Sequence, residues 1–204
     1  MKNIHQIFAK NIRSQWIKVK FYRERPNLES AKRLHDVRFC EAIKEAILHP
    51  VILDRKSINC PGALYAFGWQ DESPIPEHCQ EKTELPVKAL QSMLQQMPRF
   101  ENGFECIGLN TEGEPDLIMS RLMPKEVMDL ISLYHSNEEK NLDVSLSSMM
   151  SICGGIAVRT FLENRITFSF GCMDSRKYAQ IGRDRLVVGV PRVQFNLFEP
   201  SIFK

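Results

Sequence analysis

The chain has 204 residues, of which 43% are hydrophobic and 25% are charged, and its formal net charge at pH 7 is +2. This length and composition can support one medium-sized domain with a substantial core. The near balance of charges gives no global attraction to nucleic acid or to an anionic membrane surface, so we expect neither as a partner.

Residues 1–16 place apolar side chains at helical spacing, and we expect a helix there. Lys10 and Arg13 interrupt the apolar run, which leaves it without the uninterrupted core of a signal peptide. No stretch of the chain approaches the roughly 18 apolar residues of a membrane span. We therefore expect a cytoplasmic protein with no membrane partner.

Apolar periodicity predicts alternating strands and helices along the rest of the chain. Strands are predicted over residues 16–22, 51–54, 104–110, 117–122, 165–170 and 185–191, and residues 142–147 also alternate. Helices are predicted over residues 40–50, 63–69, 86–97, 124–135, 154–164 and 174–181. The expected fold class is α/β, with α+β as the alternative: one domain over residues 1–204, built as a sandwich of helices on a mixed sheet.

Two segments fall outside this pattern. Residues 70–86 are polar, contain three prolines and have no period, which favours a lid or a long surface loop. The C-terminal tail, residues 192–204, carries Phe195, Phe198 and Phe203. We expect this tail to fold back on the core, with a homodimer contact as the alternative.

Six cysteines in 204 residues are far fewer than a disulfide scaffold contains, so we expect reduced thiols. No two of them form a C-x-x-C pair. Cys40 precedes a predicted helix, and Cys60 lies 20 positions later, between a strand and a helix. Cys153 and Cys172, 19 positions apart, repeat this order. The repetition suggests two pseudo-symmetric halves.

Each of these four cysteines lies at a predicted helix start, where unpaired N–H groups and the helix dipole lower a thiol's pKa and favour the thiolate. Four thiolates could converge on a soft cation, which would be zinc or an iron–sulfur cluster. On spacing alone, buried and inert packing of the four thiols is the better explanation, because these separations match no known ligand signature. Arg176, one helical turn after Cys172, and Arg38, two residues before Cys40, could offset the negative charge of bound thiolates.

Six segments carry a family resemblance. They are IKVKFYRERP, RFCEAIKEA, NCPGALYAFG, EPDLIMSRLMPKEVMDL, SICGGIAV and FSFGCMDSRKYAQIGRDRLVVGVP. In this order they resemble the ArCR-type family, an uncharacterised prokaryotic domain of unknown function, over about residues 15–192. The resemblance implies that Cys40, Cys60, Cys153 and Cys172 form the site, and that Cys79 and Cys106 do not. Met173-Asp174 depart from the family pattern, which more often has Tyr-Gly there.

These observations together lead us to expect a metal-binding protein that holds an iron–sulfur cluster on Cys40, Cys60, Cys153 and Cys172, for redox or sulfur chemistry. Its partner would be a small-molecule ligand or a redox protein. A set of reactive or persulfide-handling thiols is one alternative. The other is a non-catalytic ligand-binding or structural domain, in which the thiols hold zinc or stay free. Iron and sulfide are favoured over zinc because a structural zinc site normally uses closely spaced cysteine pairs.

Overall fold

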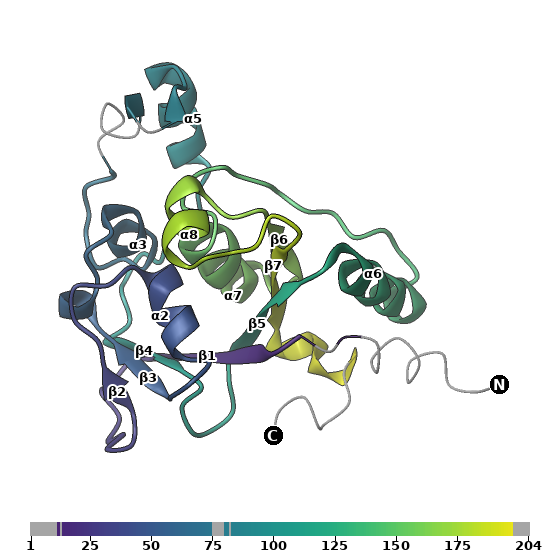
Figure 1. Ribbon diagram of the computed structural model, residues 1–204, viewed down its shortest axis with the longest axis horizontal. Helices are drawn as coiled ribbons and strands as arrows, with labels where there is room; N and C mark the ends of the chain where they lie inside the picture. The colour runs from purple at the N-terminus through teal and green to yellow at the C-terminus, as the bar shows by residue number, and fades with distance from the viewer. Residues whose placement is uncertain (1–11, 13, 75–79, 82, 198–204) are drawn as a thin grey trace.

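The protein forms one seven-stranded sheet with helices packed against it (Figure 1). The computed structural model describes residues 12, 14–74, 80, 81 and 83–197. Its strands are β1 (Trp16–Tyr22), β2 (Lys32–Arg33), β3 (Val51–Leu53), β4 (Cys106–Leu109), β5 (Leu117–Leu122), β6 (Thr167–Ser169) and β7 (Leu186–Pro191). Its α-helices are α2 (Phe39–Glu45), α3 (Pro61–Ala66), α5 (Val87–Gln95), α6 (Pro124–Glu138), α7 (Arg159–Glu163) and α8 (Met173–Tyr178). Three further helical segments are η1 (Arg55–Ser57), η2 (Cys153–Val158) and η3 (Arg192–Leu197).

The sheet is mixed, as the sequence predicts. Its strand order is β2-β3-β4-β1-β5-β7-β6. β2 pairs with β3 in parallel, whereas every other neighbouring pair is antiparallel. The fold class is therefore confirmed as a single domain of mixed α and β structure with a mixed sheet.

The topology repeats within the chain. In the first half, β1, α2, β3, α3 and β4 occur in this order, with β2, η1 and α5 as additional elements, and the strands β3-β4-β1 are neighbours in the sheet. In the second half, β5, the continuous helix η2–α7, β6, α8 and β7 occur in the same order, with α6 as an additional element, and their strands lie in the equivalent order β6-β7-β5. The corresponding first strands, β1 and β5, pair antiparallel at the centre of the sheet, with Ile17 opposite Met119. This arrangement is the one expected for an approximate two-fold axis between β1 and β5.

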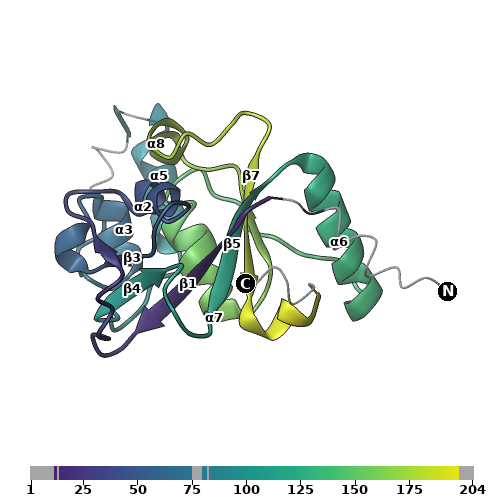
Figure 2. The same cartoon turned by 60° about the horizontal axis from the view of Figure 1, so that its bottom comes forward.

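The two faces of the sheet carry separate hydrophobic clusters because side chains alternate along a strand. On β5, Leu117 and Met119 face the larger cluster, which the cysteine-bearing helices cover. Ile118 and Leu122 face the smaller cluster, which α6 covers. Figure 2 shows α6 on the opposite side of β5 and β7 from α7. No described helix combines the length and the apolarity needed to cross a bilayer.

Some sequence-based expectations differ from the structure. Residues 142–147 alternate in hydrophobicity but form no strand, and Gln80, Glu81 and Thr83 are helical within the segment predicted as a loop. The helix expected over residues 1–16 falls largely outside the described residues, as do residues 75–79 and 82 and the end of the tail. The described part of the tail forms η3, where Leu197 is buried in the smaller cluster and Phe195 packs against it.

Candidate metal or cluster site

Four of the cysteines lie at helix starts, as predicted from the sequence. Cys60 and Cys172 are the N-cap residues of α3 and α8. Cys40 is the second residue of α2, and Cys153 is the first residue of η2. Pro61 occupies the first position of α3, where a missing N–H costs nothing. Each half of the repeat therefore contributes one cysteine at each of its two helices.

Contacts between the halves bring these four helix starts together. α2 packs against α8, which joins the Cys40 and Cys172 segments, and α3 packs against η2, which joins those of Cys60 and Cys153. Each contact crosses from one half of the repeat to the other. Figure 1 shows α2, α3, α7 and α8 gathered on one side of the sheet.

The four thiols line one cavity, which we call the cysteine cavity, with a volume of about 140 Å³. A single water molecule needs roughly 10–15 Å³ of such volume, so the cavity has room for a group of several atoms. Arg38, Asp174 and three methionines also contribute to its wall, together with Pro74 and Thr83 from either end of the segment predicted to form a lid.

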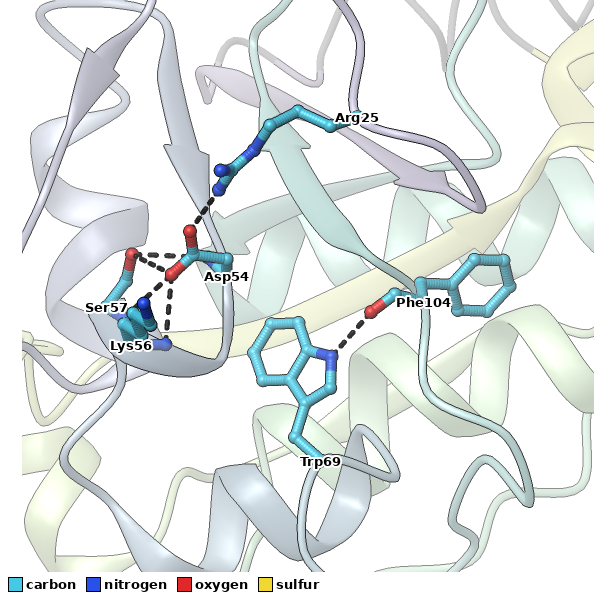
Figure 3. A network of polar contacts seen from close by, with 6 residues as sticks. All are labelled: Arg25, Asp54, Lys56, Ser57, Trp69 and Phe104. Atoms are coloured by element: carbon cyan, nitrogen blue, oxygen red, sulfur yellow. Dashed lines mark hydrogen bonds and ion pairs between the residues drawn. The ribbon is translucent and has the colours of Figure 1, made fainter.

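The segment that carries Cys60 is braced on both sides (Figure 3). Before it, the Asp54 carboxylate caps η1 by accepting hydrogen bonds from the backbone N–H groups of Lys56 and Ser57, and it forms an ion pair with Arg25. After it, the Trp69 indole N–H donates to the backbone carbonyl of Phe104. These contacts fix the approach to α3 and its exit, and with them the position of the thiol.

A close approach at Gly62 brings the two cysteine-bearing segments into contact. A Cβ atom at Gly62 would lie 2.9 Å from Cγ of Met150, which precedes η2. Met150 itself has a left-handed backbone, with φ of 45°. The glycine therefore allows α3 to approach the start of η2, where Cys153 lies.

Cys153 begins a π-helical turn, which continues directly into α7. The backbone N–H of Ala157 donates to the carbonyl of Ile152, five residues earlier, at 3.0 Å. The sequence predicted a helix from residue 154, but periodicity does not distinguish a π-helix from an α-helix. Short π-helical turns occur often at functional sites, which agrees with the location of Cys153.

The structure corrects the expectation that helix starts lower the pKa of the thiols. Burial, followed by the charges of the nearby Cys172 and Cys60 thiolates, raises the pKa of Cys40 to about 12. Burial likewise raises the pKa of Cys60, although backbone N–H groups of Ala63 and Gly62 oppose the change. The pKa of Cys153, again through burial, lies well above its ordinary value. Loss of hydration outweighs the helix termini, so these three groups are thiols at neutral pH unless a cation binds.

The two arginines singled out from the sequence lie in different places. Arg38 lines the cysteine cavity, stacks on the ring of Tyr178 at 3.8 Å, and lies 3.8 Å from the Asp174 carboxylate. Arg176 does not line the cavity, and its Nη1 donates to the backbone carbonyl of Gly182 at 3.1 Å. Of these two arginines, only Arg38 is positioned to compensate negative charge among the thiols, and it shares its charge with Asp174.

The remaining cysteines are not part of the cavity as described. Cys106 is fully buried on β4 and does not line it. Cys79 lies outside the described residues. Within residues 12, 14–74, 80, 81 and 83–197, no three His, Cys, Asp or Glu side chains are close enough to form a ready-made site for one metal ion. The thiols are arranged around a cavity, not around a single point.

Comparison with known proteins agrees with the resemblance seen in the sequence. A family model described as "Uncharacterised ArCR" matches residues 11–199. No curated protein and no solved structure shows a significant match. The function of the protein is therefore inferred from the geometry of the cysteine cavity.

Proposed function

This chain belongs to the uncharacterised ArCR family, and we propose that it holds an iron–sulfur cluster on the thiolates of Cys40, Cys60, Cys153 and Cys172, for redox or sulfur chemistry. The observation that carries the proposal is that these four cysteines, two from each half of the repeat, line one cavity. Inert packing would not require dispersed cysteines to meet in this way.

The chemistry of the donors fits such a group. Thiolates are the usual ligands of iron–sulfur clusters, and a cluster needs space for several atoms. The cysteine cavity, at about 140 Å³, offers that space, whereas a structural zinc ion needs four donors around a single point. Room for a multi-atom group therefore favours a cluster over zinc.

The charges around the cavity also favour a bound cation. Cys40 and Cys153 each have a raised pKa, first because they are buried and further because nearby thiolates would repel one another. A metal centre would relieve that repulsion by taking the place of the protons. Arg38 at the cavity wall would offset the net negative charge of a cluster held by four thiolates. When bound, a cluster supplies one-electron transfer or an iron atom that can act as a Lewis acid.

A set of free, reactive thiols is less well supported. A nucleophilic cysteine needs a thiolate near neutral pH, and burial keeps Cys40, Cys60 and Cys153 protonated. Among these alternatives, the cavity supports metal binding best.

The test is to purify the chain without oxygen and measure its visible absorption together with iron, sulfide and zinc content. We expect a brown protein with iron and acid-labile sulfide. Cys60→Ser should lose both, because Cys60 lines the cavity. Cys106→Ala is the matched control, since Cys106 is also buried but lies on β4 outside the cavity.

Two results would overturn the proposal that the protein holds an iron–sulfur cluster. Colourless protein with stoichiometric zinc that is lost in Cys60→Ser would establish the zinc alternative. Metal-free protein with freely titratable thiols would leave a ligand-binding or structural domain.

A further inference from the structure

We propose that a second cavity, on the other side of Cys40, binds a compact aliphatic monocarboxylate whose carboxylate pairs with the guanidinium of Arg121. This cavity, which we call the arginine cavity, also has a volume of about 140 Å³. The inference goes beyond the proposed cluster and does not depend on it, because it rests on arginine and aliphatic side chains.

Arg121 is the central observation. It lies on β5 and is directed toward the face that also carries Leu117 and Met119. Its Nη1 donates to the backbone carbonyl of Ala179 at 3.1 Å. Its Nη2 is buried and has no hydrogen-bond acceptor among the described residues. A buried guanidinium N–H without an acceptor is unfavourable, so this group is suited to an anion that enters the cavity.

The neighbouring Arg185 is less available to that anion, because one of its nitrogens already has hydrogen-bond acceptors. Arg185 also lines the cavity, but its Nη1 already donates to Ser14 Oγ at 3.2 Å and to the backbone carbonyl of Arg121 at 3.1 Å. The same nitrogen lies 3.8 Å from the Glu126 carboxylate. Arg185 therefore adds positive potential, while Arg121 offers the unpaired donor.

The groups around Arg121 have opposing effects on its charge. Burial lowers the pKa of the Arg121 guanidinium, a Cys40 thiolate would raise it, and the charge of Arg185 lowers it. A bound carboxylate would oppose the lowering by burial and by Arg185, and it would allow the paired N–H···O geometry that arginine forms with carboxylates.

The rest of the wall determines the class of anion. Ile17, Ile43 and Met119 are among several aliphatic side chains that line the cavity, and only a few polar groups accompany them. Phosphate and sulfate carry more oxygens and charge than these groups can satisfy, and an apolar wall would strip their hydration. A monocarboxylate needs one guanidinium, and its hydrocarbon part fits the aliphatic wall.

Cys40 connects the two cavities. It lines both of them, as does Ile152. A carboxylate held by Arg121 would therefore place its hydrocarbon part next to a residue of the proposed cluster site. A substrate or an effector of the cluster could occupy this position.

The test is calorimetric titration of the full chain with 3-methylbutanoate, alongside its neutral amide and inorganic phosphate. We expect binding of the carboxylate, with no heat from the amide or from phosphate. Arg121→Met should weaken binding by about ten- to a hundredfold, the loss typical for a hydrogen bond to a charged group. Arg183→Met is the matched control, because Arg183 is exposed and does not line the cavity.

Further variants keep the test decisive. Ile47→Trp should block the cavity from its rim, where Ile47 is 38% exposed, and should abolish binding even if Arg121→Met fails to fold. Met173→Trp should still bind, because Met173 is an exposed residue that lines the cysteine cavity and not this one. Equal binding of the acid and the amide, or full binding by folded Arg121→Met, would overturn the proposal. Loss of binding in folded Met173→Trp would overturn the assignment to the arginine cavity and move the ligand to the cysteine cavity.

Discussion

Asp54 caps η1, directly before the segment that carries Cys60. The negative charge of its carboxylate stabilises this part of the fold through the ion pair with Arg25. Partial burial raises the pKa of its carboxyl, but hydrogen bonds from Arg25 and Ser57 and the charge of Arg25 outweigh this, so that the net pKa lies below 3.8. A carboxyl whose pKa is lower in the folded state stabilises the fold above its unfolded pKa, and this contribution is lost as the pH falls through the folded value.

We predict that Asp54→Asn lowers the free energy of unfolding by about 0.5–1 kcal/mol at pH 7, the magnitude of a solvent-exposed ion pair. The amide oxygen can still cap η1, so the change isolates the charge. The difference from wild type should shrink below pH 3.8 as the wild-type carboxyl becomes protonated. Urea unfolding at several pH values measures this, with the exposed carboxylate of Glu29 changed in Glu29→Gln as the control. A deficit that stays constant down to low pH would contradict the assignment.

Arg38 and Arg176 can be compared directly, because both were predicted from the sequence to place a positive charge near the cysteines. Only Arg38 lines the cysteine cavity. If a cluster is bound there, removing the positive charge of Arg38 disfavours the uptake of an electron.

We predict that Arg38→Met lowers the reduction potential of the purified protein by an amount on the order of tens of millivolts. Arg176→Met should leave the potential unchanged, because Arg176 is directed to the Gly182 carbonyl. A spectroscopic redox titration of the three proteins compares them directly. Equal shifts in both variants would mean that the arginines act through overall charge, not through position.

At the scale of elements, the helix that begins at Cys153 is positioned by its contact with β7. Gly189 lies on β7, and a Cβ atom there would be 2.4 Å from Thr160 Oγ1 and 2.7 Å from Ile156 Cγ2. Ile156 belongs to η2 and Thr160 to α7. The glycine thus allows the whole helix to lie directly on the strand.

We predict that Gly189→Ala destabilises the protein by about 1–3 kcal/mol through overpacking. It should also reduce metal content, because the helix that must move carries Cys153. Gly155→Ala is the control from the same helix, since its Cβ would meet nothing closer than 4.0 Å. Alanine is favoured over glycine in a helix, so that variant should be neutral or slightly more stable. Thermal unfolding and metal analysis of both proteins provide the measurement, and a neutral Gly189→Ala would refute the packing argument.

Element positions were largely predictable because they depend on local patterns. Alternation identified β1, and Pro124 marked the start of α6. The π-helical form of η2 was not predictable, because it depends on packing against a distant strand. The alternating residues 142–147 form no strand, since alternation alone supplies no partner.

At the scale of the whole molecule, the repeat explains how cysteines far apart in sequence meet. The sequence shows the repeated order of cysteine, helix and strand, but it does not show how the halves are oriented. The antiparallel pairing of β1 with β5 sets that orientation and directs α2 to α8 and α3 to η2. The position of the four cysteines at helix starts was therefore predictable, whereas the cavity, the separate positions of the two arginines and the buried Arg121 required the tertiary structure.

The halves should hold together without a covalent link if this central pairing is as extensive as the structure indicates. β4 ends at Leu109 and β5 begins at Leu117, and between them Glu112, Gly113 and Glu114 are exposed. A protease site inserted between Glu112 and Gly113 would allow the folded protein to be cut between the halves. Exposed turns of this kind tolerate insertion and cleavage.

We predict that the cut protein elutes as one particle in native buffer and separates into two fragments only in denaturant. Its metal content should match that of the uncut protein, because each fragment supplies two of the four cysteines and the β1–β5 pair keeps them in place. The uncut insertion variant is the control for the insertion itself. Separation of the fragments under native conditions would show that the connection, not the sheet, holds the halves together. Retained association with loss of metal would instead show that the cysteine cavity depends on strain transmitted through the turn.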